Sequence, residues 1–163
     1  MAPMDDDLVI HSKGLTKSYG SHVALENLNL SVPRGATGLL GPNGAGKSTF
    51  LKTVLGLIQA TSGEATVLGL DIKTQGEAIR SRIGYMPEYD ALNPEMDAIH
   101  QVRYSGELLG MNPVVAQNRA HEALQFVGMG EQRYREIKSF STGMKQATKL
   151  ACAIIHDPEL IIA

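Results

Sequence analysis

The 163-residue sequence predicts an α/β fold with an N-terminal antiparallel β-subdomain, a core built around a glycine-rich loop, and a helical insert. Three observations support this prediction. Apolar and polar residues alternate with a period of two over roughly the first thirty residues, as in half-buried strands. The period becomes helical directly after the segment "GPNGAGKST". Beyond Pro87 the composition favours helices, until a short apolar run ends the sequence.

The β-subdomain and the core are predicted from the first part of the chain. The alternating runs "LVIHSKGLTKSY" and "HVALENLNLSV" flank Gly20-Ser21, which predicts a pair of antiparallel strands. After the turn "PRG", a short apolar strand is expected to run up to Gly41. A helix is expected from Lys47, with apolar residues at helical spacing as far as Ile58. The segment "TSGEATVLG" predicts a turn and a strand, and "SRIGYM" predicts a short strand that ends near Met86.

Three helices and a last strand are predicted in the rest of the chain. One helix is expected over residues 97–109, although Gly106 weakens it. The next begins with Asn112 as its N-cap and Pro113 at the first helical position. The last runs from about 141 to 155, and the residues after Pro158 predict a buried strand. The expected division is an acidic tail (1–7), a β-subdomain and loop core (8–86), a helical subdomain (87–140), and a final helix and return strand (141–163).

Composition excludes several classes of function. The apolar fraction of 43% and the charged fraction of 20% are those of a globular protein, and the net charge of −2 gives no basic field for nucleic acid. The first residues are acidic, unlike a signal peptide, and no apolar run is long enough to span a membrane. A cytosolic protein is therefore expected. The single cysteine, Cys152, cannot form an internal disulfide and is expected to be a buried core thiol.

The segment "GPNGAGKST" matches the pattern G-x-x-x-x-G-K-[ST] of a phosphate-binding loop. Glycines let the loop curl so that successive backbone N–H groups point inward, and the following helix adds the positive end of its dipole. The lysine can reach the β- and γ-phosphates, and the serine hydroxyl can coordinate Mg²⁺. The pattern therefore predicts binding of a nucleoside triphosphate. The predicted phosphate-binding residues are Gly41, Pro42, Asn43, Gly44, Ala45, Gly46, Lys47, Ser48 and Thr49.

The stretch "LLGPNGAGKSTFLKTVLGLIQATSGEATVLG" resembles the start of an ATP-binding cassette (ABC) ATPase, the motor domain of ABC transporters. The resemblance covers almost the whole chain, from about Leu8 to Ala163. It implies a P-loop NTPase core that binds ATP and Mg²⁺ and hydrolyses ATP, with Lys47 as a catalytic residue. It also implies a head-to-tail dimer with a second ABC ATPase domain, and docking of the helical insert onto transmembrane permease subunits or domains. The expected location is the cytoplasmic face of the membrane.

The resemblance assigns roles to two residues outside the loop. Tyr19, in "LTKSYG", occupies the position of an aromatic residue that stacks on adenine in the family. Glu88, in "IGYMPEYDAL", stands where the family usually has a glutamine that senses Mg²⁺ and the γ-phosphate. Glu88 is a departure from the family pattern, since a carboxylate can accept a metal or water but cannot donate as an amide does. It is retained as a candidate catalytic residue and metal ligand, together with Ser48 as a metal ligand.

The segment "SFSTGMKQ" resembles the family signature Leu-Ser-Gly-Gly-Gln and, more closely, the version found in exporters of the ABC-2 type. Ser141 and Gly143 match the motif, whereas Thr142 and Met144 depart from it. The resemblance implies that Ser141 and the N–H groups of Gly143 and Met144 lie at a helix N-terminus. There they would face the γ-phosphate held by the other subunit.

In the family, "PELIIA" is the strand that leads into the Walker B Asp-Glu pair, which positions Mg²⁺ and polarises the attacking water. The sequence stops before that pair, so the resemblance implies an incomplete ABC ATPase domain with very weak hydrolysis by this chain alone. His156 precedes the strand and is expected at a helix end, not as the family's switch histidine. Two alternatives stay open: a short regulatory module that binds nucleotide without hydrolysis, and a soluble ABC-type ATPase not involved in transport.

Overall fold

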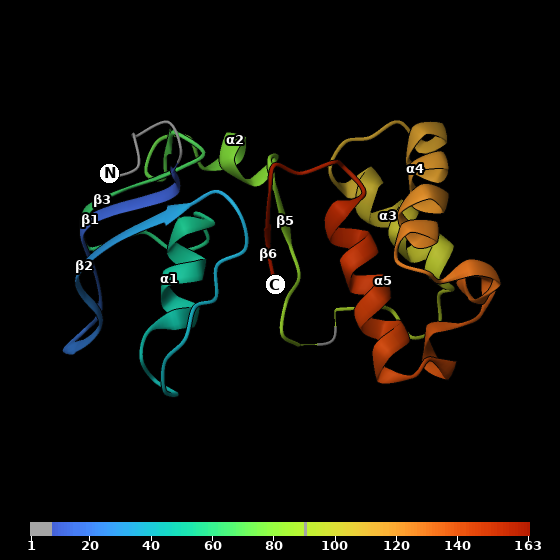
Figure 1. The fold of residues 1–163 in the computed structure, drawn as a ribbon, viewed down its shortest axis with the longest axis horizontal. Coiled ribbons are helices and arrows are strands. Elements are labelled where there is room, and N and C mark those ends of the chain that lie inside the picture. Colours follow the sequence, from blue (N-terminus) through green and yellow to red (C-terminus); the bar gives the residue numbers. More distant parts are fainter. Residues whose placement is uncertain (1–7, 90) are drawn as a thin grey trace. The chain divides into compact units, whose positions relative to one another are not determined.

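The computed structural model describes residues 8–89 and 91–163, and the predicted acidic tail over residues 1–7 lies outside them. The described chain forms two compact units that meet in sequence between Arg80 and Ser81 (Figure 1). Each unit has its own secondary structure and its own set of buried side chains.

The first unit is built on a four-stranded antiparallel sheet in the order β2-β1-β3-β4. The predicted hairpin of the first two strands is confirmed: Tyr19 pairs with His22 across the turn, and the ladder extends back to Leu8 and Pro33. Figure 1 shows the helix α1 lying along this sheet. The elements are β1 (Leu8–Tyr19), β2 (His22–Pro33), α1 (Lys47–Val54), β3 (Ser62–Val67), β4 (Leu70–Asp71) and α2 (Gly76–Arg80).

The helix α1 begins where predicted, at Lys47, but ends about one turn earlier than the expected Ile58. Gly56 adopts a left-handed conformation with φ 66°, and the N–H of Leu57 donates to the carbonyl oxygen of Lys52 at 2.9 Å. A glycine of this kind ends a helix by turning the chain back onto its last carbonyl groups. The buried hydrophobic side chains of this unit are Val9, Ile10, Leu15, Leu25, Phe50, Val54, Leu55, Ala65, Val67, Ile72 and Ile79.

The prediction of a short strand just before the glycine-rich loop is wrong. Residues 36–41 lie between β2 and α1 without forming a ladder with any strand of the described chain. Leu40 is 93% exposed. An apolar run becomes a strand only when a neighbour accepts its backbone hydrogen bonds, and that neighbour cannot be read from the run itself.

The second unit contains three helices and two short strands, each of which the sequence predicts, and the structure pairs the strands in parallel. The strands pair in register from Ile83 with Leu160 to Tyr85 with Ile162. Figure 1 shows α3, α4 and α5 grouped together in this unit. The elements are β5 (Ile83–Tyr85), α3 (Ala98–Leu108), α4 (Pro113–Phe126), the 3₁₀ helices η2 (Gly130–Tyr134) and η3 (Ile137–Ser139), α5 (Thr142–Ile154) and β6 (Leu160–Ile162).

Side-chain caps define where the three helices of this unit begin. The carboxylate of Asp97 accepts from the N–H of His100 at 2.9 Å, and the amide oxygen of Asn112 accepts from Val114 N–H at 2.9 Å. The hydroxyl of Ser141 accepts from Met144 N–H at 3.3 Å. Such caps satisfy N–H groups that have no acceptor within their helix. The predicted cap at Asn112 is thereby confirmed.

One hydrophobic cluster holds the helices of the second unit together, and Cys152 lies at its edge. The Cys152 side chain is half-buried, so it is less enclosed than predicted. Burial still raises the pKa of its thiol to about 11, and the side chain is a neutral thiol at physiological pH. The buried members are Ala98, Ile99, Val102, Ala120, Ala123, Leu124, Met129, Ile137, Phe140, Ala151 and Ile155.

Along the described residues, no helix is both long and apolar enough to cross a lipid bilayer.

We expect truncation of Leu124 to test the cluster of the second unit. Leu124 is 0% exposed, so Leu124→Ala should lower the free energy of unfolding by about 2–5 kcal/mol through lost burial and a residual cavity. Phe126 lies two residues further along α4 and is 80% exposed. Phe126→Ala should therefore change stability by only about 0.5 kcal/mol. Chemical unfolding of the two variants checks both values, and equal losses would contradict the packing described for α4.

Candidate functional site

The glycine-rich loop leads into α1 through a position that only glycine can occupy. Gly46 is the N-cap of α1 and is left-handed, with φ 87° and ψ 3°. A β-carbon at this position would lie 2.4 Å from the carbonyl oxygen of Ala24 and 2.8 Å from Cδ2 of Leu25, both on β2. A side chain here is thus excluded both by backbone conformation and by the close approach of β2. The sheet thereby fixes the place where the loop turns into the helix.

Lys47 folds back across the loop. Its ammonium group donates to the carbonyl oxygen of Gly41 at 2.6 Å and to that of Pro42 at 2.8 Å. The N–H of Ala45 also donates to the Pro42 oxygen at 3.2 Å, which closes a tight turn. An ammonium has three donors, so these two hydrogen bonds leave one for an anion in the loop. The positive charge is therefore held at the loop by the carbonyl groups of the loop itself.

The first turn of α1 is suited to bind an anion. No side chain caps this helix, and its first N–H groups have no intrahelical acceptor. The positive end of the helix dipole adds to the charge of Lys47. Ser48 is exposed on this turn, and Phe50 is buried beneath it. Backbone donors, an ammonium and a hydroxyl are thus gathered at one helix end, as phosphate recognition requires.

Tyr19 lies in the same unit, at the end of β1 next to the hairpin turn. Its side chain is 48% exposed. The ammonium of Lys17 stands 5.0 Å from the centroid of the tyrosine ring. In the view of Figure 1, the hairpin turn and the glycine-rich loop lie toward the same end of this unit.

Glu88 lies in the second unit, on an exposed loop after β5. A residue that sequence reasoning missed holds this loop: the ammonium of Lys149, on α5, donates to the carbonyl oxygens of Pro87 at 2.9 Å and Tyr89 at 3.4 Å. Lys149 is only 5% exposed. Its two acceptors immediately flank Glu88, so α5 supports the backbone that carries this carboxylate. A lysine within the otherwise apolar "KLACAII" was the available signal in the sequence.

Ser141 stands at the N-terminus of α5, where the sequence predicts it. The preceding Phe140 is 7% exposed and belongs to the hydrophobic cluster, which anchors the chain just before the helix begins. The Ser141 hydroxyl accepts from Met144 N–H, so that N–H is already engaged within the helix. The hydroxyl proton of Ser141 is left to donate outward, because the oxygen is the accepting atom in the cap.

His156 follows α5 and faces β5. Its Nε2 lies 3.2 Å from the carbonyl oxygen of Ile83, an acceptor, so Nε2 carries the proton and donates. Its Nδ1 is buried and has no hydrogen-bond partner among the described residues. Burial lowers the pKa of His156, although Ile83 and Asp157 oppose the shift. The position at a helix end agrees with the prediction, and burial is the largest of the influences on the pKa of His156.

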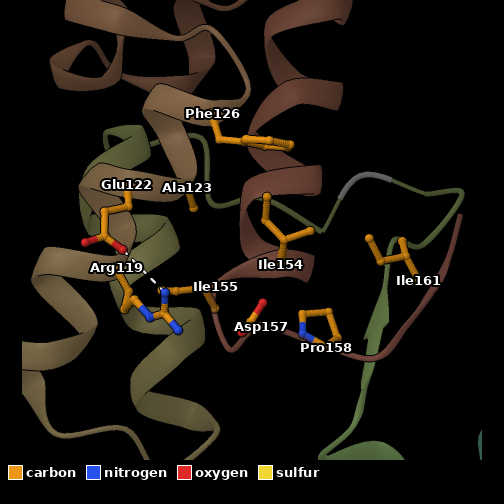
Figure 2. Close-up of a pocket in the computed structure, with 9 residues that line it drawn as sticks. All are labelled: Arg119, Glu122, Ala123, Phe126, Ile154, Ile155, Asp157, Pro158 and Ile161. Atoms are coloured by element: carbon orange, nitrogen blue, oxygen red, sulfur yellow. Dashed lines mark hydrogen bonds and ion pairs between the residues drawn. The ribbon is translucent and has the colours of Figure 1, made fainter.

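A cavity of about 420 Å³ in the second unit lies among α4, α5 and the start of β6 (Figure 2). Its lining is largely aliphatic and aromatic, with Phe126 on α4 and Ile154 on α5. Figure 2 shows the guanidinium of Arg119 directed at the carboxylate of Glu122, and the two charges lie 3.4 Å apart. Among the described lining residues there is none of the site residues predicted from the sequence. The cavity therefore does not contribute to the phosphate-binding loop.

A glycine-rich loop that runs into an uncapped helix, with a lysine folded across it, defines a protein with a phosphate-binding loop. The chain belongs to the ABC transporter family, whose family model matches residues 25–163.

Individual relatives agree with this assignment. The chain is 34% identical to the Nod factor export ATP-binding protein I of Cupriavidus metallidurans, over 94% of this chain and 51% of that protein. It is 35% identical to the linearmycin resistance ATP-binding protein LnrL of Bacillus subtilis, over 94% of this chain and 50% of that protein. The chain thus spans about half the length of these curated relatives.

The fold also matches solved structures of the family. One is an ATP-binding cassette solved as a dimer in a post-hydrolysis state, bound to ADP and Pi. The two structures align with a TM-score of 0.79 at 26% identity, over 93% of this chain and 72% of that one. The predicted α/β fold of the ABC ATPase type is therefore confirmed.

Lys149→Met should destabilise the protein, because two carbonyl groups at a buried site lose a charged donor. We expect the free energy of unfolding to fall by about 1–3 kcal/mol. Hydrogen exchange of the loop around Glu88 should also become faster, since α5 no longer holds it. Lys73→Met, at an exposed lysine, is the control and should leave both measurements unchanged. Unchanged exchange in the Lys149 variant would contradict a supporting role.

Stability should depend on pH through His156. Its folded pKa is lowered from the ordinary 6.5, so below that value the unfolded chain binds the proton more readily than the folded protein. The contribution of His156 to the free energy of unfolding is complete above pH 6.5 and is lost as the pH falls toward the folded pKa of His156. Wild-type protein should therefore lose more stability than His156→Gln between about pH 7.5 and about pH 5. Urea unfolding at both pH values, with His22→Gln as control, checks this; parallel losses in wild type and His156→Gln would refute it.

Proposed function

We propose that the protein is the ATP-binding subunit of an ABC transporter of the exporter type. It binds ATP at the loop of residues 41–49 and, in the complete protein, hydrolyses the ATP to drive transport across a membrane. The observation that carries this proposal is the ammonium of Lys47, held over the loop at 2.6 Å from the Gly41 oxygen and 2.8 Å from the Pro42 oxygen. The names of the two relatives, which concern export and resistance, support the transport part of the proposal.

The proposed nucleotide lies with its phosphates in the loop. The β- and γ-phosphates accept from the free N–H of Lys47 and from backbone N–H groups of the first turn of α1. Tyr19 stacks on the adenine at the hairpin end of the same unit. In hydrolysis the phosphoryl group passes to water, and Lys47 stabilises the negative charge that spreads over the γ-phosphate oxygens.

Mg²⁺ is the cofactor that this site accommodates. Mg²⁺ prefers oxygen ligands and keeps several waters, and the exposed hydroxyl of Ser48 lies on the turn that faces the bound phosphates. When bound, the ion neutralises part of the phosphate charge. The parts of Glu88 in metal binding and of Ser141 and Gly143 in contacting a γ-phosphate stay predictions from the sequence.

Two partners belong to the proposal. A second ABC ATPase domain would complete a head-to-tail dimer; the dimeric post-hydrolysis structure of a family member supports the dimer, and its head-to-tail arrangement stays a prediction. Transmembrane permease subunits or domains would receive the helical subdomain and select the transported substrate. The subunit would then lie on the cytoplasmic face of the membrane. No nucleic-acid partner is proposed.

Lys47→Ala should abolish measurable ATP binding by the full-length protein, because the loop loses the charge that meets the phosphates. Lys52→Ala is the matched control, since Lys52 is an exposed lysine in the last turn of the same helix. It should bind ATP like the wild type. Equilibrium binding of a fluorescent ATP analogue, with unlabelled ATP as competitor, measures both variants.

The same proteins distinguish the remaining alternatives when hydrolysis is measured. Wild-type hydrolysis that is lost in Lys47→Ala supports the ATPase. Binding without hydrolysis by the full-length protein would favour the non-hydrolysing regulatory module. Hydrolysis in a protein that co-purifies with no membrane protein would favour a soluble ATPase outside transport. Equal binding by Lys47→Ala and wild type would overturn the proposed site.

A further inference from the structure

We propose that Lys17 is a positioning residue that holds the ring of Tyr19 as a platform for the nucleotide base. The inference rests on the proposed binding of ATP at the loop and adds to it a residue that determines how the base is received. It concerns β1 and the segment before β3, both of which lie in the first unit.

The ammonium of Lys17 is fixed between two acceptors of different kinds. It donates to the carbonyl oxygen of Gln59 at 2.7 Å and lies 5.0 Å from the centroid of the Tyr19 ring. The side chain of Lys17 is half-buried, so part of its hydration has already been removed. A cation at this distance from an aromatic face is attracted by the quadrupole of the ring, and more strongly when it is desolvated.

The segment that carries the Gln59 carbonyl is tied to β1 at Thr61. The N–H of Ser18 donates to the hydroxyl of Thr61 at 3.0 Å, and the N–H of Thr61 donates to the carbonyl oxygen of Thr16 at 2.8 Å. These two hydrogen bonds join Thr61 to β1 at the residues on either side of Lys17, and Thr61 lies two positions after Gln59. The ammonium is therefore placed by backbone structure, and the ring of Tyr19 is placed by the ammonium.

This arrangement prepares the tyrosine for stacking. With the ammonium on one face, a ring that remains 48% exposed has its other face available to a flat ligand. The cation also withdraws electron density from the ring, which reduces repulsion between its open face and the π-face of a purine. Since the ring is ordered before binding, less conformational entropy is lost when the base arrives. Lys17 thus acts on the base and leaves the phosphate contacts alone.

Calorimetry of the full-length protein, with ATP and inorganic tripolyphosphate as probes, tests whether Lys17 affects the base and not the phosphates. Lys17→Met should weaken ATP binding about two- to fivefold, the range expected for one cation–π contact. Tripolyphosphate has no base, and its affinity should stay at the wild-type value. Lys17→Arg should bind ATP with nearly the wild-type affinity, since a guanidinium can also lie over the ring and donate to the carbonyl oxygen of Gln59. Lys13→Met, at an exposed lysine on the same strand, is the control and should change neither affinity.

A double-mutant cycle shows whether Lys17 acts through Tyr19. In a Tyr19→Leu background, Lys17→Met should have no further effect on ATP binding. Equal weakening of ATP and tripolyphosphate by Lys17→Met would overturn the inference, because Lys17 would then act on the loop or on the fold. Unchanged ATP binding, or a full effect of Lys17→Met in the Tyr19→Leu background, would also overturn it. A wild-type protein that binds tripolyphosphate but not ATP, or neither, would contradict the proposed function itself.

Discussion

The first unit depends on the contact between Gly46 and the carbonyl of Ala24. With no space for a β-carbon, β2 approaches the start of α1 closely and the chain turns there in a left-handed conformation. The sheet therefore determines both the direction of α1 and the curvature of the loop before it. Through this one close approach, the hairpin of β1 and β2 supports the proposed phosphate site.

The second unit uses a different means to hold its candidate residues. Phe140 is buried in the hydrophobic cluster, and Ser141 follows it directly at the helix N-terminus. Further along the same helix, buried Lys149 holds both carbonyls that flank Glu88. One helix, α5, thus carries Ser141 at its N-terminus and supports the loop of Glu88 through Lys149. A movement of α5 would be transmitted to both places within this unit.

Most elements of the fold could be predicted from the sequence because their signals are local. A cap such as Asn112 or a turn such as Gly20-Ser21 acts within a few residues. The prediction of a strand before the loop was wrong because a strand forms only with a partner strand, which lies far away in the sequence. The end of α1 was misplaced because the apolar spacing continues past Gly56, where the backbone turns.

In the candidate site too, the sequence predicts the features that depend on local spacing and misses those that depend on distant residues. The loop residues and the start of α1 are recognisable from their spacing, but the bonds of Lys47 to the loop carbonyls are not. Lys149 and Lys17 were missed because each acts on a segment about forty to sixty residues away in sequence. A lysine in an apolar helix or beside a tyrosine gives no sign of its acceptor. Only the tertiary structure brings the two together.

The hydrogen bonds of Lys47 to its own loop have a consequence for the exchange of ligands at the proposed site. A loop that depends on its ligand for its shape would collapse whenever a product departs, and would have to reform before the next substrate entered. Here the ammonium donates to two carbonyl groups of the loop, so the side chain and the loop hold each other in place. We therefore expect the dwell time of the proposed nucleotide to be set by the contacts that the nucleotide makes, and not by the reopening of its site. Such a site would suit the proposed transporter subunit, which has to release its product and bind new ATP in every cycle.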